Sequence, residues 1–184
     1  MFLLRHGQSL FNLHFTNTRR DPGIEDPELT PLGHAQAETA AASLAGEKIT
    51  RIIVSPYTRA LQTVQPFLRH HPVPVDVMEE VRERFAFICD IGRHRDLLAE
   101  RFPHHRFDHL PEQWWPPVRE SGAATIARAN LFRALMASRP DHETTLLVSH
   151  WAFILALTGI SVPNGELLTY DPTQPPPEEI VWRP

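Results

Sequence analysis

The stretch MFLLRHGQSLFN, residues 1–12, joins a short apolar strand to an arginine, a histidine and a glycine. Arg5 offers a planar fork of N–H donors that matches the oxygens of a phosphate group. His6 can act as a nucleophile near neutral pH, because the ordinary pKa of an imidazole is about 6.5. Gly7 lets the backbone turn sharply and approach a ligand closely. The pattern favours a phosphate site, although a purely structural strand end can contain the same residues.

Apolar segments that suit strands alternate along the chain with segments that suit helices. Thr30-Pro31 and Ser55-Pro56 each resemble a helix start, with a hydroxyl N-cap followed by proline. The alternation predicts an α/β fold with a mostly parallel central sheet and helices on both faces. Strands are predicted over residues 2–4, 51–54, 73–78 and 144–149, and helices over residues 8–15, 30–45, 55–69, 121–138 and 151–157.

Three of the predicted strands run directly into residues that can bind or transfer phosphate. Arg5 and His6 follow the first strand, Arg59 follows the second, and His150 follows the last. In open α/β sheets the ligand crevice lies beyond the carboxyl ends of the strands. If these strands are parallel and adjacent, the four side chains share one crevice, toward which helix N-termini also direct N–H groups.

Length and composition predict one domain over residues 1–184 with no nucleic-acid partner. The formal net charge is −4 at pH 7, so any anion site must be built locally. The single cysteine, Cys89, excludes an internal disulfide and fits a reducing cytoplasm, where we expect the protein to reside. The most apolar stretch, residues 151–162, is too short to span a membrane. Residues 82–119 are rich in charge, His, Pro and Trp, which indicates a variable insertion over one end of the sheet.

Four segments of the chain resemble motifs of one known family, the histidine phosphatase superfamily, also called phosphoglycerate mutase-like. The first is Arg5-His6-Gly7-Gln8-Ser9 with Asn12 following it. The others are Asp26 to Ala37 (DPELTPLGHAQA), Ser55 to Thr63 (SPYTRALQT) and Val148-Ser149-His150. The resemblance extends from Phe2 to about Tyr170 and implies the three-layer sandwich of that family.

The resemblance also implies roles for individual residues. His6 would attack phosphorus and carry a covalent phosphohistidine, while Arg5, Arg59 and His150 would bind the phosphoryl oxygens. Asn12 lies where the family places a further phosphate contact, and Ser9 is a candidate helper. No cofactor and no metal are implied, and no cluster of metal-ligating residues is compelling.

The leaving alcohol needs a proton, and so the site needs a general acid. The family often supplies a Glu from a Leu-x-Glu segment after a strand, and Val81-Arg82-Glu83 matches that position. Glu83 is therefore the predicted acid, with Glu79 and Glu80 as rivals. The residues that follow Glu83 depart from the family pattern. Trp151, where most members have glycine, either lines the pocket or packs in the core.

We therefore expect a metal-independent phosphatase that hydrolyses a small phosphate monoester, with the insertion at residues 82–119 covering its site. The first alternative is a phosphoglycerate mutase, whose members share these motifs but are usually longer. The second is a phosphate-binding regulatory domain without activity. The retention of Arg5, His6, Arg59 and His150 argues against that second alternative.

Overall fold

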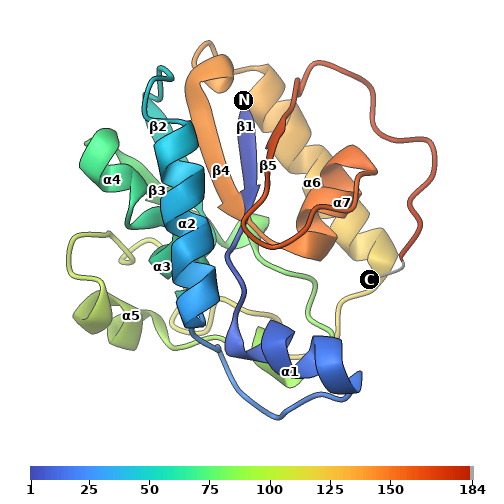
Figure 1. Ribbon diagram of the computed structural model, residues 1–184. Helices are drawn as coiled ribbons and strands as arrows, with labels where there is room; N and C mark the ends of the chain where they lie inside the picture. Colours follow the sequence, from blue (N-terminus) through green and yellow to red (C-terminus); the bar gives the residue numbers. More distant parts are fainter. Residues whose placement is uncertain (183–184) are drawn as a thin grey trace.

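A five-stranded sheet forms the centre of the computed structural model, which describes residues 1–182 (Figure 1). The order of its strands is β3-β2-β4-β1-β5. The first four are mutually parallel, and β5 runs antiparallel to β1. The prediction of an α/β fold with a mostly parallel sheet is confirmed. The strand bounds are β1 (Phe2–Arg5), β2 (Arg51–Val54), β3 (Val75–Val77), β4 (Thr145–Ser149) and β5 (Leu167–Thr169).

Helices cover both faces of the sheet (Figure 1). Successive strand residues point to opposite faces, and both faces carry apolar side chains that pack against helices. Leu4 packs into the core under α2 and α3, whereas Leu3 packs into the core under α6 and α7. The helices are α1 (Leu10–Thr18), α2 (Pro31–Ser43), α3 (Thr58–Val64), α4 (Phe67–His70), α5 (Arg95–Arg101), α6 (Gly122–Ala137) and α7 (Trp151–Thr158). Short 3₁₀ helices are η1 (Glu79–Val81), η2 (Ile88–Asp90) and η3 (His142–Thr144).

Hydroxyl side chains fix the starts of three helices. The side chain of Ser9 accepts from the backbone N–H of Asn12 at the start of α1. Thr30 accepts from Gly33 N in the same way, with Pro31 as the first residue of α2. Ser121 caps α6. These caps satisfy N–H groups that have no partner within the helix.

The helix predicted over residues 55–69 differs from the structure in two respects. Ser55 is not its N-cap, because the helix begins at Thr58, and the Ser55 hydroxyl bonds to His150 instead. Pro66 lacks a backbone N–H and so divides the segment into α3 and α4. The sequence interpretation also missed α5 and β5.

The segment over residues 82–119 contributes to both the core and the site. Trp114 and Trp115 are buried in the core on the α2 and α3 side. The Trp114 indole N–H donates to Arg93 O at 2.9 Å. Residues 83–90 lie beside the cavity described below. Within the described residues, no helix combines the length and apolar character that crossing a bilayer requires.

Candidate active site

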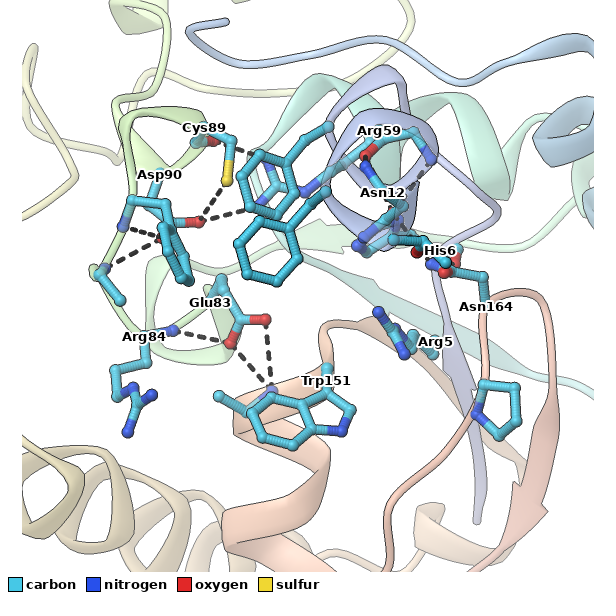
Figure 2. Close-up of a pocket in the computed structure, with 18 of the residues that line it drawn as sticks. Arg5, His6, Asn12, Arg59, Glu83, Arg84, Cys89, Asp90, Trp151 and Asn164 are labelled. Carbon is cyan, nitrogen blue, oxygen red and sulfur yellow. Dashed lines mark hydrogen bonds and ion pairs between the residues drawn. The ribbon is translucent and has the colours of Figure 1, made fainter. Parts of the chain in front are cut away.

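A cavity of about 390 Å³ lies at the carboxyl end of β1, beside α1 (Figure 2). Five of the six predicted site residues line it: Arg5, His6, Asn12, Arg59 and Glu83. They reach it from β1, from the loop after β1, from α1, from α3 and from the segment after η1. The crevice expected at the strand ends is therefore present, and its lining combines cations, an imidazole and a carboxyl group.

His6 is held in a single protonation state by its surroundings. Its Nδ1 lies 2.7 Å from Gly7 O, and because a carbonyl oxygen only accepts, Nδ1 carries the hydrogen. Burial, followed by the charges of Arg59 and Arg5, holds the pKa of His6 well below its usual 6.5. The imidazole is therefore neutral at neutral pH. Its Nε2 keeps a free lone pair, as a nucleophile requires.

His150 is next to His6 but does not line the cavity itself. The two ring centroids are 5.0 Å apart, and His150 Nε2 lies 2.7 Å from Ser55 Oγ. Burial, followed by the charges of Arg59, His6 and Arg5, holds the pKa of His150 well below 6.5. Its buried Nδ1 has no partner among the described residues. If the Ser55 hydroxyl donates to Nε2, then Nδ1 carries the hydrogen and can donate to a bound oxyanion.

Two arginines place positive charge at the same end of the cavity. Arg5 Nη1 donates to Val162 O at 2.9 Å, and its buried Nε has no partner among residues 1–182. Burial lowers the pKa of Arg5 to about 10, which still leaves it charged at neutral pH. Arg59 is 3 % exposed and lies over the Tyr57 ring, 4.2 Å from its centroid. These fixed cations suit an anionic ligand.

Asp90, which the sequence interpretation did not single out, orients Arg59. Arg59 Nη2 donates to Asp90 Oδ1 at 3.2 Å, and Nη1 donates to Cys89 O at 2.9 Å. Asp90 Oδ2 accepts from the N–H groups of Ala86 and Phe87, both at 3.0 Å. Asp90 thus joins Arg59 to the loop after Glu83. No local motif marks Asp90; the one available signal is that a buried arginine needs a carboxylate partner.

Asn12 presents a free amide donor to the cavity. Its Oδ1 accepts from Ser9 N at 3.1 Å, from Ser9 Oγ at 2.9 Å and from Asn164 Nδ2 at 3.1 Å. These contacts orient the amide, and Nδ2 makes no hydrogen bond within the described chain. Asn164, which sequence reasoning also missed, donates to His6 O at 3.0 Å and so joins the loop after β1 to the segment before β5.

Glu83 is the one of the three rival glutamates that lines the cavity (Figure 2). Its Oε1 accepts from Arg84 N at 2.8 Å and from Ala152 N at 3.0 Å. Burial, reinforced by the charge of Asp90, raises the pKa of Glu83. A raised pKa keeps a carboxyl group protonated closer to neutral pH, as a proton donor requires. Glu79 and Glu80 lie outside the lining.

Two glycines allow the loop after β1 to pack directly on α2. A Cβ atom on Gly7 would lie 2.3 Å from Gly33 O, and one on Gly33 would lie 2.1 Å from Gln8 O. Thr63 Oγ1 also accepts from Gly7 N at 3.1 Å. The backbone beside His6 is thereby fixed against α2 and α3.

Taken together, the site offers a neutral imidazole, buried cations and a carboxyl group with a raised pKa around one cavity. This set suits transfer of a phosphoryl group. The family model of the histidine phosphatase superfamily (branch 1) matches residues 1–171. The chain belongs to the histidine phosphatase superfamily. Three curated proteins are similar to most of this chain.

The adenosylcobalamin/alpha-ribazole phosphatase of Escherichia coli (strain K12) is 25% identical over 153 residues, which cover 82% of this chain and 72% of the relative. The glucosyl-3-phosphoglycerate phosphatase of Mycolicibacterium vanbaalenii is 27% identical over 180 residues, which cover 91% of this chain and 78% of the relative. The probable phosphoglycerate mutase GpmB of Proteus mirabilis is 28% identical over 160 residues, which cover 82% of this chain and 68% of the relative.

Solved structures share this histidine phosphatase fold. The mycobacterial glucosyl-3-phosphoglycerate phosphatase in complex with VO3 superimposes with a TM-score of 0.61 at 25% identity, covering 91% of this chain and 88% of that one. A putative alpha-ribazole-5'-P phosphatase from E. coli gives a TM-score of 0.63 at 24% identity, and the match covers 90% of this chain and 87% of that one. The latter likeness concerns the fold only.

Proposed function

We propose that this histidine phosphatase superfamily member hydrolyses phosphate monoesters of a small molecule through a phosphohistidine on His6, without a metal ion. The observation that carries the proposal is the state of His6, whose Nδ1–H is engaged by Gly7 O. Its neutral Nε2 is therefore free to attack phosphorus beside Arg5 and Arg59. Two of the curated relatives are named phosphatases, which supports hydrolysis over other phosphoryl transfers.

The proposed reaction has two steps, both of which use residues of the cavity. First, His6 Nε2 forms a bond to phosphorus while the bond from phosphorus to the ester oxygen breaks. Glu83 gives its proton to that oxygen, and the alcohol leaves. Second, water attacks the phosphohistidine, Glu83 takes up one of its protons, and the N–P bond breaks. Inorganic phosphate then leaves, and His6 is neutral again.

The phosphoryl oxygens are assigned to Arg5, Arg59, Asn12 Nδ2 and His150 Nδ1. Charge spreads over these oxygens during transfer, so donors fixed before the reaction lower its barrier. The unpartnered buried nitrogens Arg5 Nε and His150 Nδ1 support this assignment, because a bound oxyanion would supply the partners they lack.

His6→Ala tests the proposal directly. Loss of the nucleophile should lower phosphate release from a panel of monoesters by several orders of magnitude. It should also abolish an acid-labile, base-stable phosphoenzyme trapped during turnover. His34→Ala is the matched control, because His34 is exposed on α2. Undiminished turnover in the His6 variant, or wild-type activity that disappears with EDTA, would contradict the mechanism.

The GpmB relative gives phosphoglycerate mutase activity a specific basis as the second candidate. The same panel should therefore be run with and without 2,3-bisphosphoglycerate. Interconversion of phosphoglycerate isomers with little phosphate release would favour the mutase. Tight phosphate binding without any turnover would favour a regulatory domain.

A further inference from the structure

The cavity has an apolar outer part whose chemistry is not needed for phosphate handling. Three phenylalanines form a cluster on one side: Phe11 and Phe15 from α1, and Phe87 from the segment before η2. The ring centroids are 5.0 Å apart for Phe11 and Phe15, 5.3 Å for Phe11 and Phe87, and 5.1 Å for Phe15 and Phe87. All three line the cavity, and Phe87 remains 37 % exposed.

A fourth aromatic side chain, Trp151, lines the cavity from the start of α7 (Figure 2). Its indole Nε1–H donates to Ser161 Oγ at 2.9 Å, which fixes the orientation of the ring. Val162 and Pro163 continue this wall. A ligand whose phosphate lies between Arg5 and Arg59 therefore meets apolar surface as it extends outward.

The two remaining cations of the cavity, Arg19 and Arg84, are both associated with aromatic rings. Arg84 lies over the Trp182 ring, 4.6 Å from its centroid, and Arg19 lies 6.0 Å from the centroid of Phe15. Figure 2 shows the Arg84 guanidinium directed away from Arg5. The carboxylates of the lining, Glu83 and Asp90, are engaged by backbone N–H groups. Both guanidinium groups therefore lie near aromatic rings, which extends the aromatic character of this part of the molecule.

We propose that the preferred substrate is a phosphate monoester whose alcohol carries an aromatic ring, bound between the phenylalanine cluster and Trp151. The inference deepens the proposed function and rests on it for the position of the phosphate. Burying an apolar ring here removes both ligand and protein surface from water. A small alcohol with a carboxylate would instead place charge against phenylalanine rings, which is unfavourable.

Phosphonates, which cannot be hydrolysed, test this inference independently of catalysis. Calorimetry should show that 2-phenylethylphosphonate binds the wild-type protein about 30-fold more tightly than ethylphosphonate, since a buried aromatic ring contributes on this scale. The ratio should fall below about fivefold in Phe15→Ala and in Phe87→Ala. Leu131→Ala is the control, because Leu131 is 75 % exposed on α6 and does not line the cavity. It should keep the wild-type ratio.

A ratio near one in the wild-type protein, or tighter binding of 3-phosphonopropionate than of the phenyl compound, would overturn the inference. Turnover of 2-phenylethyl phosphate and ethyl phosphate separates the two proposals, because their leaving alcohols have similar acidity. A preserved binding ratio without hydrolysis of either ester supports the aromatic pocket and contradicts the proposed phosphatase activity. Hydrolysis of both esters at similar kcat/KM, with equal phosphonate affinities, contradicts the aromatic pocket alone.

Discussion

At the scale of single residues, the site controls where protons reside. His6 is kept without a charge by burial and by two arginines, so the lone pair on its Nε2 is free over the neutral range. The pKa of Glu83 is shifted in the opposite direction, upward, because burial and the charge of Asp90 favour its protonated form. Opposite shifts in neighbouring groups are a common way to separate nucleophile from acid.

Glu83→Gln should slow esters of poor leaving groups far more than aryl phosphates. The glutamine can still accept from Ala152 N, so the fold should persist, but it has no proton to transfer. We expect kcat for ethyl phosphate to fall by about 10²- to 10⁴-fold and kcat for para-nitrophenyl phosphate by less than about tenfold. Steady-state kinetics measure both. Glu80→Gln is the control, because Glu80 is exposed; a selective loss in that variant would transfer the acid role to Glu80.

The pH dependence of alkyl ester hydrolysis should report the same group. The first step needs protonated Glu83, so kcat/KM falls as pH rises through its pKa. Because that pKa is raised, the fall should come at higher pH than for an ordinary carboxyl group. This fall of kcat/KM at high pH should be absent from the residual activity of Glu83→Gln. The same fall in both proteins would mean that another group titrates there.

At the scale of elements, the position of His6 depends on close contact between the loop after β1 and the start of α2. Thr30 N donates to Gln8 O at 2.9 Å, and the Thr30 hydroxyl donates to Gln8 Oε1 at the same distance. Gln36 of α2 accepts from Gln8 N at 2.8 Å. Together with the glycine contact, these bonds make the His6 loop and α2 one mechanical unit.

Gly33→Ala should destabilise the protein by about 3 kcal/mol or more, because its Cβ would meet backbone rather than a movable side chain. Urea unfolding followed by circular dichroism measures the free energy of unfolding. Gly46→Ala provides the matched control, since a Cβ there meets nothing within 4 Å. It should change stability by less than about 0.5 kcal/mol. Equal stability of the two variants would show that the loop and α2 can separate.

At the scale of the whole molecule, neutral buried histidines make stability depend on pH. The pKa of His6 is lowered in the folded protein, so its contribution is present above about pH 6.5 and is lost as pH falls below that value. His150 acts in the same direction. Glu83 and Asp90 have raised pKa values, and their contributions are lost as pH rises.

A variant that lacks His6 isolates the contribution of His6 to the pH dependence of stability. Between about pH 6.5 and pH 5, the free energy of unfolding of His6→Asn should fall less steeply than that of the wild type, by up to about 1.4 kcal/mol per pH unit. The carboxylates are present in both proteins, so their opposite effect largely cancels in the comparison. Urea unfolding at a series of pH values provides the data. Parallel curves for the two proteins would mean that His6 is charged when folded.

The sequence predicted those parts of the fold that local patterns determine. The β2 segment is a short β-branched run, and Thr30-Pro31 marks the start of α2 as expected. It did not predict β5, whose three residues carry no distinctive pattern and depend on pairing with β1. Ser55 followed by Pro56 resembles a cap, but a tertiary contact with His150 uses that hydroxyl.

The residues of the site likewise divide into those that local sequence pattern predicts and those that depend on tertiary contacts. Arg5, His6 and Arg59 lie next to strand ends, where topology alone brings them together. Asp90 and Asn164 come from irregular segments, and their places depend on how these segments pack against Arg59 and His6. Local sequence pattern therefore locates the charged and titratable groups of the cavity, and tertiary packing supplies the residues that orient them.

The position of β1 in the sheet has a consequence for synthesis. Both partners of β1 lie late in the chain: β4 begins at Thr145, about 140 residues beyond β1, and β5 begins still later, at Leu167. At about 5–20 residues per second, the strand that leads to His6 leaves the ribosome roughly 7 to 30 s before its first partner. During that interval its apolar edge is exposed, and chaperone binding to stalled nascent chains should be strongest before β4 emerges. Crosslinking of chains stalled before and after residue 149 would measure this directly.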